Sequence, residues 1–125
     1  MDQKICLDTD ISIEILKETS KGKHFLDLIE ESHVFITAIS IFELFQRETN
    51  LDAAEKLLFR LNTLDFNELS ARKASEILKN LKHQGRPIEI RDLFIASTAI
   101  VNNCTLATLN RKHFEHIKEL KLLEF

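Results

Sequence analysis

Short apolar runs alternate with longer stretches of helical periodicity along this chain. The first run, Ile5-Cys6-Leu7, ends on Asp8, and an unbroken apolar run of this length is typical of a strand buried on both faces of a parallel sheet. Strands are predicted at residues 4–7, 33–36, 63–66, 104–107 and 120–125, the last at an edge of the sheet. Apolar residues three or four positions apart predict helices at residues 11–19, 22–31, 39–47, 50–61, 67–83, 92–102 and 111–117.

Strands that alternate with helices pair in parallel through crossover connections. The sequence therefore predicts an α/β fold, a three-layer α/β/α sandwich around a central, mainly parallel sheet. The clearest break in the chain is Gln84-Gly85-Arg86-Pro87, which contains the only proline and one of the two glycines. No linker, repeat or low-complexity tract divides the sequence, so residues 1–125 are expected to form a single domain.

Composition narrows the class of protein only slightly. With 44% hydrophobic and 30% charged residues, the chain is typical of an ordinary soluble domain. No apolar stretch approaches the ~20 residues of a membrane span, and the start of the chain does not resemble a signal peptide, so a cytoplasmic location is expected. Cys6 and Cys104 lie in predicted strands and are interpreted as core residues in a reducing compartment. The net charge of −3 disfavours tight non-specific binding of nucleic acid, but it allows an enzyme whose bound cation meets phosphate.

Three acids stand near the points where strands end and helices begin. Asp8 directly follows the first strand, Glu43 lies in the helix after the second strand, and Asp92 begins an unusually apolar helix. Each has a structural explanation, because acids at helix starts cap amides and complement the helix dipole. Ser40-x-x-Glu43 is formally a capping box, in which the glutamate bonds back to the Ser40 amide. Asp10 is the predicted N-cap of helix 11–19, which leaves Asp8 for another role.

The topology favours a common site for Asp8, Glu43 and Asp92. The carboxyl ends of parallel strands lie on one edge of the sheet, and the helices that follow them begin there. Three carboxylates in one crevice repel one another unless a cation or protons compensate their charge. Oxygen ligands without convergent histidine or cysteine favour Mg²⁺ or Mn²⁺ over zinc, and such a site activates a water for attack on a phosphodiester.

Four motifs follow one another in an order that covers nearly the whole chain. They are Leu7-Asp8-Thr9-Asp10, Thr37-x-x-Ser40-x-x-Glu43-Leu44, Arg91-Asp92-Leu93-Phe94-Ile95-Ala96-Ser97-Thr98-Ala99 and Leu106-Ala107-Thr108-Leu109-Asn110-x-x-x-Phe114. In these motifs the sequence resembles PIN-domain ribonucleases, in particular the VapC-like toxins of bacterial and archaeal toxin–antitoxin pairs. The resemblance implies a single PIN-like domain that cleaves RNA with a divalent metal ion, with Asp8, Glu43 and Asp92 as the acidic site. It also implies a homodimer and a cognate antitoxin that wraps the toxin and blocks the site.

Asn110 departs from the fuller family pattern, in which many members carry a further aspartate. Its side chain can contact a metal-bound water but adds no negative charge, so the number of metal ions, one or two, stays open. Asn110 is also a candidate N-cap for helix 111–117. Thr9, Ser40 and Thr108 are expected to support the site by orienting its carboxylates through their hydroxyls.

Basic residues and histidines carry less information. Four basic residues fall in loops or helix starts that can rim the crevice and hold RNA phosphates. They are Arg86, Arg91, Arg111 and Lys112. The five histidines show no ligand spacing beyond the weak pair His113 and His116, and they are interpreted as surface residues.

The primary hypothesis is an Mg²⁺- or Mn²⁺-dependent endoribonuclease. Asp8 and Asp92 bind the metal ion, and Glu43 helps directly or through water. Three alternatives stay open: an RNA-processing nuclease that is not a toxin, a non-catalytic binding module of the same fold, and a haloacid-dehalogenase-like phosphatase. In the phosphatase, Asp8 would attack phosphorus and Asp10 would act as acid and base, although the later lysine and paired aspartates of that class are missing.

Overall fold

Four strands form the sheet of the computed structural model, which describes residues 3–30 and 32–125. They are β1 (Lys4–Leu7), β2 (His33–Thr37), β3 (Asn62–Leu64) and β4 (Thr105–Ala107), in the order β3-β2-β1-β4. All neighbouring strands are parallel, and Leu7 lies beside Ile36 on one side and Ala107 on the other. The predicted parallel sheet is confirmed, and the carboxyl ends of β1, β2 and β4 meet at one edge.

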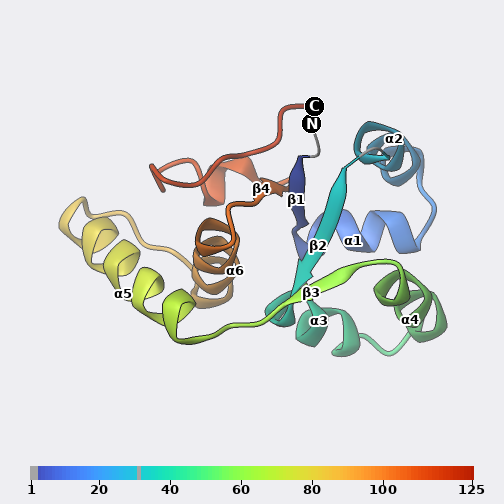
Figure 1. Cartoon of the computed structure of the whole chain (residues 1–125), viewed down its shortest axis with the longest axis horizontal. Helices are drawn as coiled ribbons and strands as arrows, with labels where there is room; N and C mark the ends of the chain where they lie inside the picture. Colours follow the sequence, from blue (N-terminus) through green and yellow to red (C-terminus); the bar gives the residue numbers. More distant parts are fainter. Residues whose placement is uncertain (1–2, 31) are drawn as a thin grey trace.

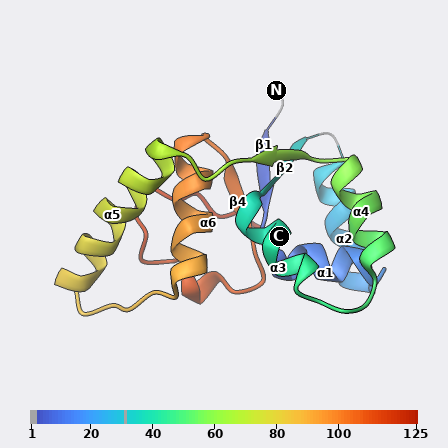
Figure 2. The same ribbon diagram turned by 90° about the horizontal axis from the view of Figure 1, so that it is seen from below.

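Helices cover both faces of this sheet (Figures 1 and 2). In the described part of the chain they are α1 (Thr9–Leu16), α2 (Ser20–Ile29), α3 (Ala38–Phe45), α4 (Leu51–Phe59), α5 (Glu68–His83), α6 (Ile90–Val101) and the 3₁₀ turn η1 (Arg111–His113). The helices α1, α2 and α4 lie on one side of the sheet, and α5 and α6 lie on the other (Figure 2). None of the helices in residues 3–30 and 32–125 is long and apolar enough to cross a membrane.

Alternate residues of β1 pack into two separate cores. Cys6 belongs to the core beneath α5 and α6, whereas Ile5 and Leu7 belong to the core beneath α1 and α2. Successive side chains of a strand point to opposite faces, so a strand between two layers of helices must be apolar at every position. The unbroken apolar run that opens the chain is thereby explained, and the three-layer α/β/α architecture is confirmed.

Four helices, α1, α2, α3 and α6, begin one or two residues earlier than predicted, and in α1 and α3 this follows from the residue that caps the helix after the strand. The helix α1 begins at Thr9, with Asp8 rather than Asp10 in the extended conformation of an N-cap. The helix α3 begins at Ala38, because the Thr37 hydroxyl accepts a hydrogen bond from the Ser40 amide at 3.1 Å. Thr37 both ends β2 and caps α3, whereas Asp8 is the single residue between β1 and α1. The change from strand to helix after β1 and β2 therefore takes at most one connecting residue.

The segment after β4 differs most from the predicted elements. Helix 111–117 is reduced to η1, followed by turns in which Phe114, Ile117 and Leu120 are all buried. Their spacing of three matches the backbone bonds from Ile117 to Phe114 and from Leu120 to Ile117, which favour tight turns over an α-helix. Strand 120–125 is reduced to one isolated bridge between Leu122 and Leu106. Glu31, the predicted end of the second helix, lies outside the described residues.

Gly22 allows α2 to pack closely against α1. A Cβ at this position would collide with the carbonyl oxygen of Glu14 and lie 2.9 Å from the amide nitrogen of Ile15. We expect Gly22→Ala to lower the free energy of unfolding by about 1–3 kcal/mol, the usual cost of overpacking, although alanine is the better helix former. Urea unfolding measures this change.

The matched control is Gly85→Asn. A Cβ at Gly85 meets nothing within 4 Å, and asparagine tolerates its φ of 67°. Equal unfolding midpoints for Gly22→Ala and the unmodified protein would contradict the close approach of the two helices.

Candidate active site

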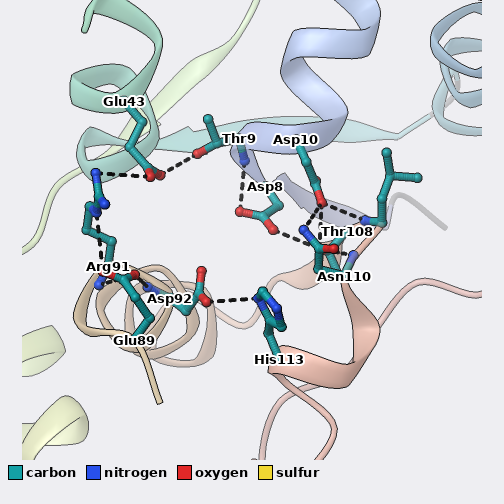
Figure 3. A network of polar contacts seen from close by, with 11 residues as sticks. Asp8, Thr9, Asp10, Glu43, Glu89, Arg91, Asp92, Thr108, Asn110 and His113 are labelled. Carbon is teal, nitrogen blue, oxygen red and sulfur yellow. Dashed lines mark hydrogen bonds and ion pairs between the residues drawn. The ribbon is translucent and has the colours of Figure 1, made fainter.

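Asp8, Glu43 and Asp92 surround one opening at the carboxyl edge of the sheet (Figure 3). Asp8 follows β1, Glu43 lies in α3, and Asp92 lies in the first turn of α6. Asp8 is 5% exposed, whereas the side chains of Glu43 and Asp92 are 23% and 20% exposed. One carboxylate therefore lies at the bottom of the opening and two lie at its sides.

Two hydrogen bonds hold the buried carboxylate of Asp8. Its Oδ1 accepts from the Thr9 amide at 2.8 Å, and its Oδ2 accepts from the Thr108 hydroxyl at 2.7 Å. Burial and the neighbouring charge of Asp10 raise the pKa of Asp8 to about 7, although both hydrogen bonds act to lower it. A cation beside Asp8 would favour the charged carboxylate and offset the cost of its burial.

Asp10 connects α1 to the loop after β4 and is not the helix cap that we predicted. Its Oδ2 accepts hydrogen bonds from the Leu109 amide at 3.1 Å and from Asn110 Nδ2 at 2.9 Å. Its Oδ1 accepts from the Ile11 amide at 2.6 Å. The cap prediction was wrong because Asp8, directly after the strand, already has the extended backbone that an N-cap needs. A carboxylate held by this many donors is poorly suited to the acid and base role of the phosphatase alternative.

Asn110 also differs from its predicted capping role. Its side chain makes no capping bond to η1 and donates instead to Asp10. Its backbone amide donates to the Thr108 hydroxyl at 3.0 Å. Since that hydroxyl donates to Asp8, the amide of Asn110 helps to fix the group that orients the buried carboxylate.

Glu43 is held from two sides. The Thr9 hydroxyl donates to Glu43 Oε1 at 2.6 Å and lies 2.9 Å from the Ser40 hydroxyl, while Arg91 Nη1 lies 3.6 Å from Glu43 Oε2. The capping-box interpretation was wrong, because the Ser40 amide donates to Thr37 rather than to Glu43. Glu43 is thus available at the opening.

Asp92 is also oriented by two neighbours. Its amide donates to the carboxylate of Glu89, which caps α6 and starts the helix at Ile90, two residues before the predicted position. The side chain of Asp92 is thereby left for the opening, where its Oδ2 lies 3.1 Å from His113 Nδ1. Burial raises the pKa of Asp92, and the nearby His113 acts in the opposite direction. His113 was missed because the only sequence signal was its three-residue spacing from His116.

The four basic residues predicted to contact RNA lie in different surroundings. Arg86 and Lys112 line a small cavity beside Asp92. Arg91 lies between the carboxylates of Glu43 and Glu89. Arg111 donates to the carbonyl of Leu123 at 2.9 Å and pairs with Glu124. Only the first two thus have guanidinium or ammonium groups without a carboxylate partner among the described residues.

The donor set fits a hard divalent cation. No three histidine, cysteine, aspartate or glutamate side chains in residues 3–30 and 32–125 lie close enough to enclose a metal ion by themselves. The acids at the opening offer carboxylate oxygens, and burial together with the neighbouring charge of Asp10 raises the pKa of Asp8. Mg²⁺ commonly keeps several waters and takes only one or two carboxylates from the protein, which this arrangement can supply.

Comparison with known proteins agrees with the fold and the order of the motifs. Residues 5–120 match the model of the PIN domain family, and the chain therefore belongs to that family. "Ribonuclease VapC1" of Methanocaldococcus jannaschii is 32% identical over 123 residues, which cover 97% of this chain and 86% of that protein.

Solved structures give the same result at the level of the fold. The crystal structure of VapBC2 from Rickettsia felis, bound to a DNA fragment from their promoter, contains a chain with a TM-score of 0.88 and 28% identity, covering 98% of this chain and 99% of that one. In VapBC-1 from nontypeable Haemophilus influenzae the TM-score is 0.85 and the identity 30%, with 98% of both chains covered. Within the PIN-domain family, this chain is one of the VapC ribonucleases, the toxins of toxin–antitoxin pairs.

We expect Asp8→Asn to stabilise the metal-free protein at pH 8. The pKa of Asp8 in the folded protein, about 7, lies above its ordinary value of 3.8. The protonated carboxyl group therefore stabilises the folded protein fully below pH 3.8, and this stabilisation is lost as the pH rises through 7. An asparagine at position 8 does not ionise, so the loss of stability at high pH does not occur. Its side chain accepts one hydrogen bond fewer than the carboxylate does. The net gain should be on the order of 2 kcal/mol, since one pKa unit is worth about 1.4 kcal/mol.

Thermal melts in EDTA at acidic and alkaline pH test this expectation. The difference between Asp8→Asn and the unmodified protein should be largest at pH 8 and should shrink toward the ordinary pKa of an aspartate. Asp65→Asn, at an exposed acid in the β3–α5 connection, serves as control. An unmodified protein that melts higher than Asp8→Asn at pH 8 would show that the buried charge is already compensated.

Proposed function

We propose that this VapC ribonuclease cleaves RNA internally with Mg²⁺ or Mn²⁺ held by Asp8 and Asp92, and that Glu43 contacts the ion directly or through water. The observation that carries the proposal is the convergence of three carboxylates on one opening, with the most buried of them at a pKa of about 7. When bound, the ion supplies charge stabilisation at the phosphate and activates the attacking water. The family's ribonuclease activity supports this function over a phosphatase or a non-catalytic binding module.

Thr9 is the central positioning residue in this proposal. Its amide donates to Asp8 and its hydroxyl donates to Glu43, so one residue orients two of the three acids. Thr108 fixes the other oxygen of Asp8, and Ser40 contacts the Thr9 hydroxyl. These contacts keep the carboxylates from turning away from one another in the absence of a cation, which reduces the reorganisation needed on binding.

We propose that Asp10 and Asn110 act together on the position of the loop after β4. The bond between their side chains holds this loop against the first turn of α1. Since Asp10 carries the negative charge of the pair, Asn110 supports the site through Asp10 rather than as an acid.

We also propose that this toxin acts in the cytoplasm as a homodimer with a cognate antitoxin. The related VapBC structures from R. felis and H. influenzae support the antitoxin. A groove of about 800 Å³ between α1, α2 and α4 offers apolar Ile15, Leu26 and Leu57 with charges of both signs around them, which suits an amphipathic helix. The exposed Phe42 and Phe45 of α3 are candidates for contact with the antitoxin or the second subunit.

Asp92→Asn should leave the fold intact and slow RNA cleavage at least ~100-fold, because it removes a charged ligand from a metal site that contributes several kcal/mol. Initial rates on tRNA, ribosomal RNA and mRNA with Mg²⁺ or Mn²⁺ measure the loss, and circular dichroism reports the fold. Asp65→Asn should cleave at the rate of the unmodified protein. Equal rates for Asp92→Asn and the unmodified protein would rule out the proposed site.

Removal of divalent ions should stop cleavage reversibly. EDTA is expected to abolish activity, and excess Mg²⁺ or Mn²⁺ should restore it. The same ions should raise the melting temperature of the unmodified protein at pH 8, where Asp8 is charged, but should have little effect on Asp8→Asn. Cleavage that persists in EDTA would contradict the metal-dependent mechanism.

A further inference from the structure

A small cavity of about 230 Å³ lies beside the acidic opening and is bordered by four nitrogen-bearing side chains. These are Arg86, Lys112, His113 and His116, and we refer to the space between them as the Arg86 cavity. One wall comes from the loop between α5 and α6, and the other from the residues around η1. Asp92 lines the same cavity, so the cavity and the acidic opening share a wall.

Arg86 is held in place without being neutralised. Its Nη1 donates to His116 Nε2 at 2.9 Å, and histidine must be the acceptor because a guanidinium has no acceptor atom. Within residues 3–30 and 32–125, no carboxylate forms an ion pair with Arg86 or Lys112. Glu89 also lines the cavity, but its oxygens accept from the amides of α6 and pair with Arg91. Positive charge is thus left facing the cavity.

The guanidinium and ammonium groups of this cavity, unpaired within the described residues, suit a small anion. A volume of 230 Å³ is below the range of cofactor pockets but suits one phosphate with part of its sugar. A guanidinium presents paired donors that match phosphate oxygens, and a lysine adds a point charge. The chain's net charge of −3 gives RNA little general attraction, so local contacts of this kind must position the strand.

We infer that the Arg86 cavity binds a phosphate of the RNA strand adjacent to the phosphate that is cleaved. The inference rests on the proposed function, because Asp92 is the residue that connects the cavity to the acidic opening. Arg86 and Lys112 contact the phosphate, and His116 positions Arg86. His113, which lines the cavity and whose Nδ1 lies 3.1 Å from Asp92 Oδ2, is the structural link between strand binding and the acidic site.

Binding is tested in the Asp92→Asn background, where RNA stays uncleaved, with a fluorescently labelled single-stranded RNA. We expect Arg86→Gln to raise the Kd about 5–10-fold and to reduce the slope of log K against log salt by about 0.7, the value for one phosphate of a single strand. Arg86→Lys should retain part of the affinity for RNA, because lysine keeps the positive charge but lacks the paired donors of the guanidinium group. The matched control Arg72→Gln makes the same charge change at an exposed arginine paired with Glu68 and should alter neither quantity.

A neutral methylphosphonate at the phosphate on either side of the cleaved one gives a second test. At the position that occupies the cavity, it should weaken binding to Asp92→Asn alone but have little further effect when Arg86→Gln is also present. Equal Kd values and salt slopes with and without Arg86→Gln would overturn the inference. Unchanged RNA binding together with loss of a co-purifying antitoxin would also overturn it and assign the cavity to that protein.

In the cleaving enzyme, Arg86→Gln should raise KM and leave kcat within about twofold, as expected when binding is lost equally from the ground and transition states. A fall in kcat at constant KM would contradict a strand-binding role. The two ideas fail in different ways. If the proposed function were wrong, the unmodified protein would not cleave RNA, but Arg86→Gln would still weaken RNA binding.

Discussion

The parallel pairing of β1 with β2 and β4 is the constraint on which the acidic site depends. With Leu7 beside both Ile36 and Ala107, the three strands end within one residue of one another, and the Asp8 amide continues the pairing through a hydrogen bond to the Ala107 carbonyl at 2.9 Å. A slip of one residue would turn Asp8 to the opposite face and place an apolar residue at the opening. The two apolar cores on either side of β1 prevent that slip, so core packing fixes the position of a charged group.

The strand-to-helix changes at this edge combine structural and chemical roles in the same residues. Asp8 directly follows a strand, caps a helix and presents a buried carboxylate, and Thr37 caps α3 so that Glu43 does not have to. Likewise, Glu89 caps α6, so that Asp92 does not have to. In both α3 and α6, one residue accepts hydrogen bonds from the free amides at the start of the helix and another residue faces the opening. This division reconciles the stability of helix starts with a cluster of acids that repel one another.

The sheet, the layers and the convergence of the acids could be predicted, because apolar runs and the order of strands and helices are local signals. The caps could not, since the choice between Asp8 and Asp10 depends on the residue at which the strand's backbone ends. The roles of Asp10 and His113 depend on contacts with the β4–η1 loop and with α6, respectively, which no local pattern encodes. His113 and His116 are three residues apart, but so are Phe114 and Ile117, which are both buried. The spacing of the two histidines therefore did not distinguish them from residues that are spaced for packing.

The bonds from Thr108 to Asp8 and from Asn110 to Asp10 each join residues 100 positions apart. All residues as far as the β4–η1 loop must therefore leave the ribosome before the buried carboxylate acquires its partners. A nascent chain that has emerged only as far as α5 lacks Asp92 and the donors of the β4–η1 loop. For a ribonuclease synthesised beside the RNA of its own ribosome, this order of assembly delays a competent site until the β4–η1 loop has been made and has folded against α1.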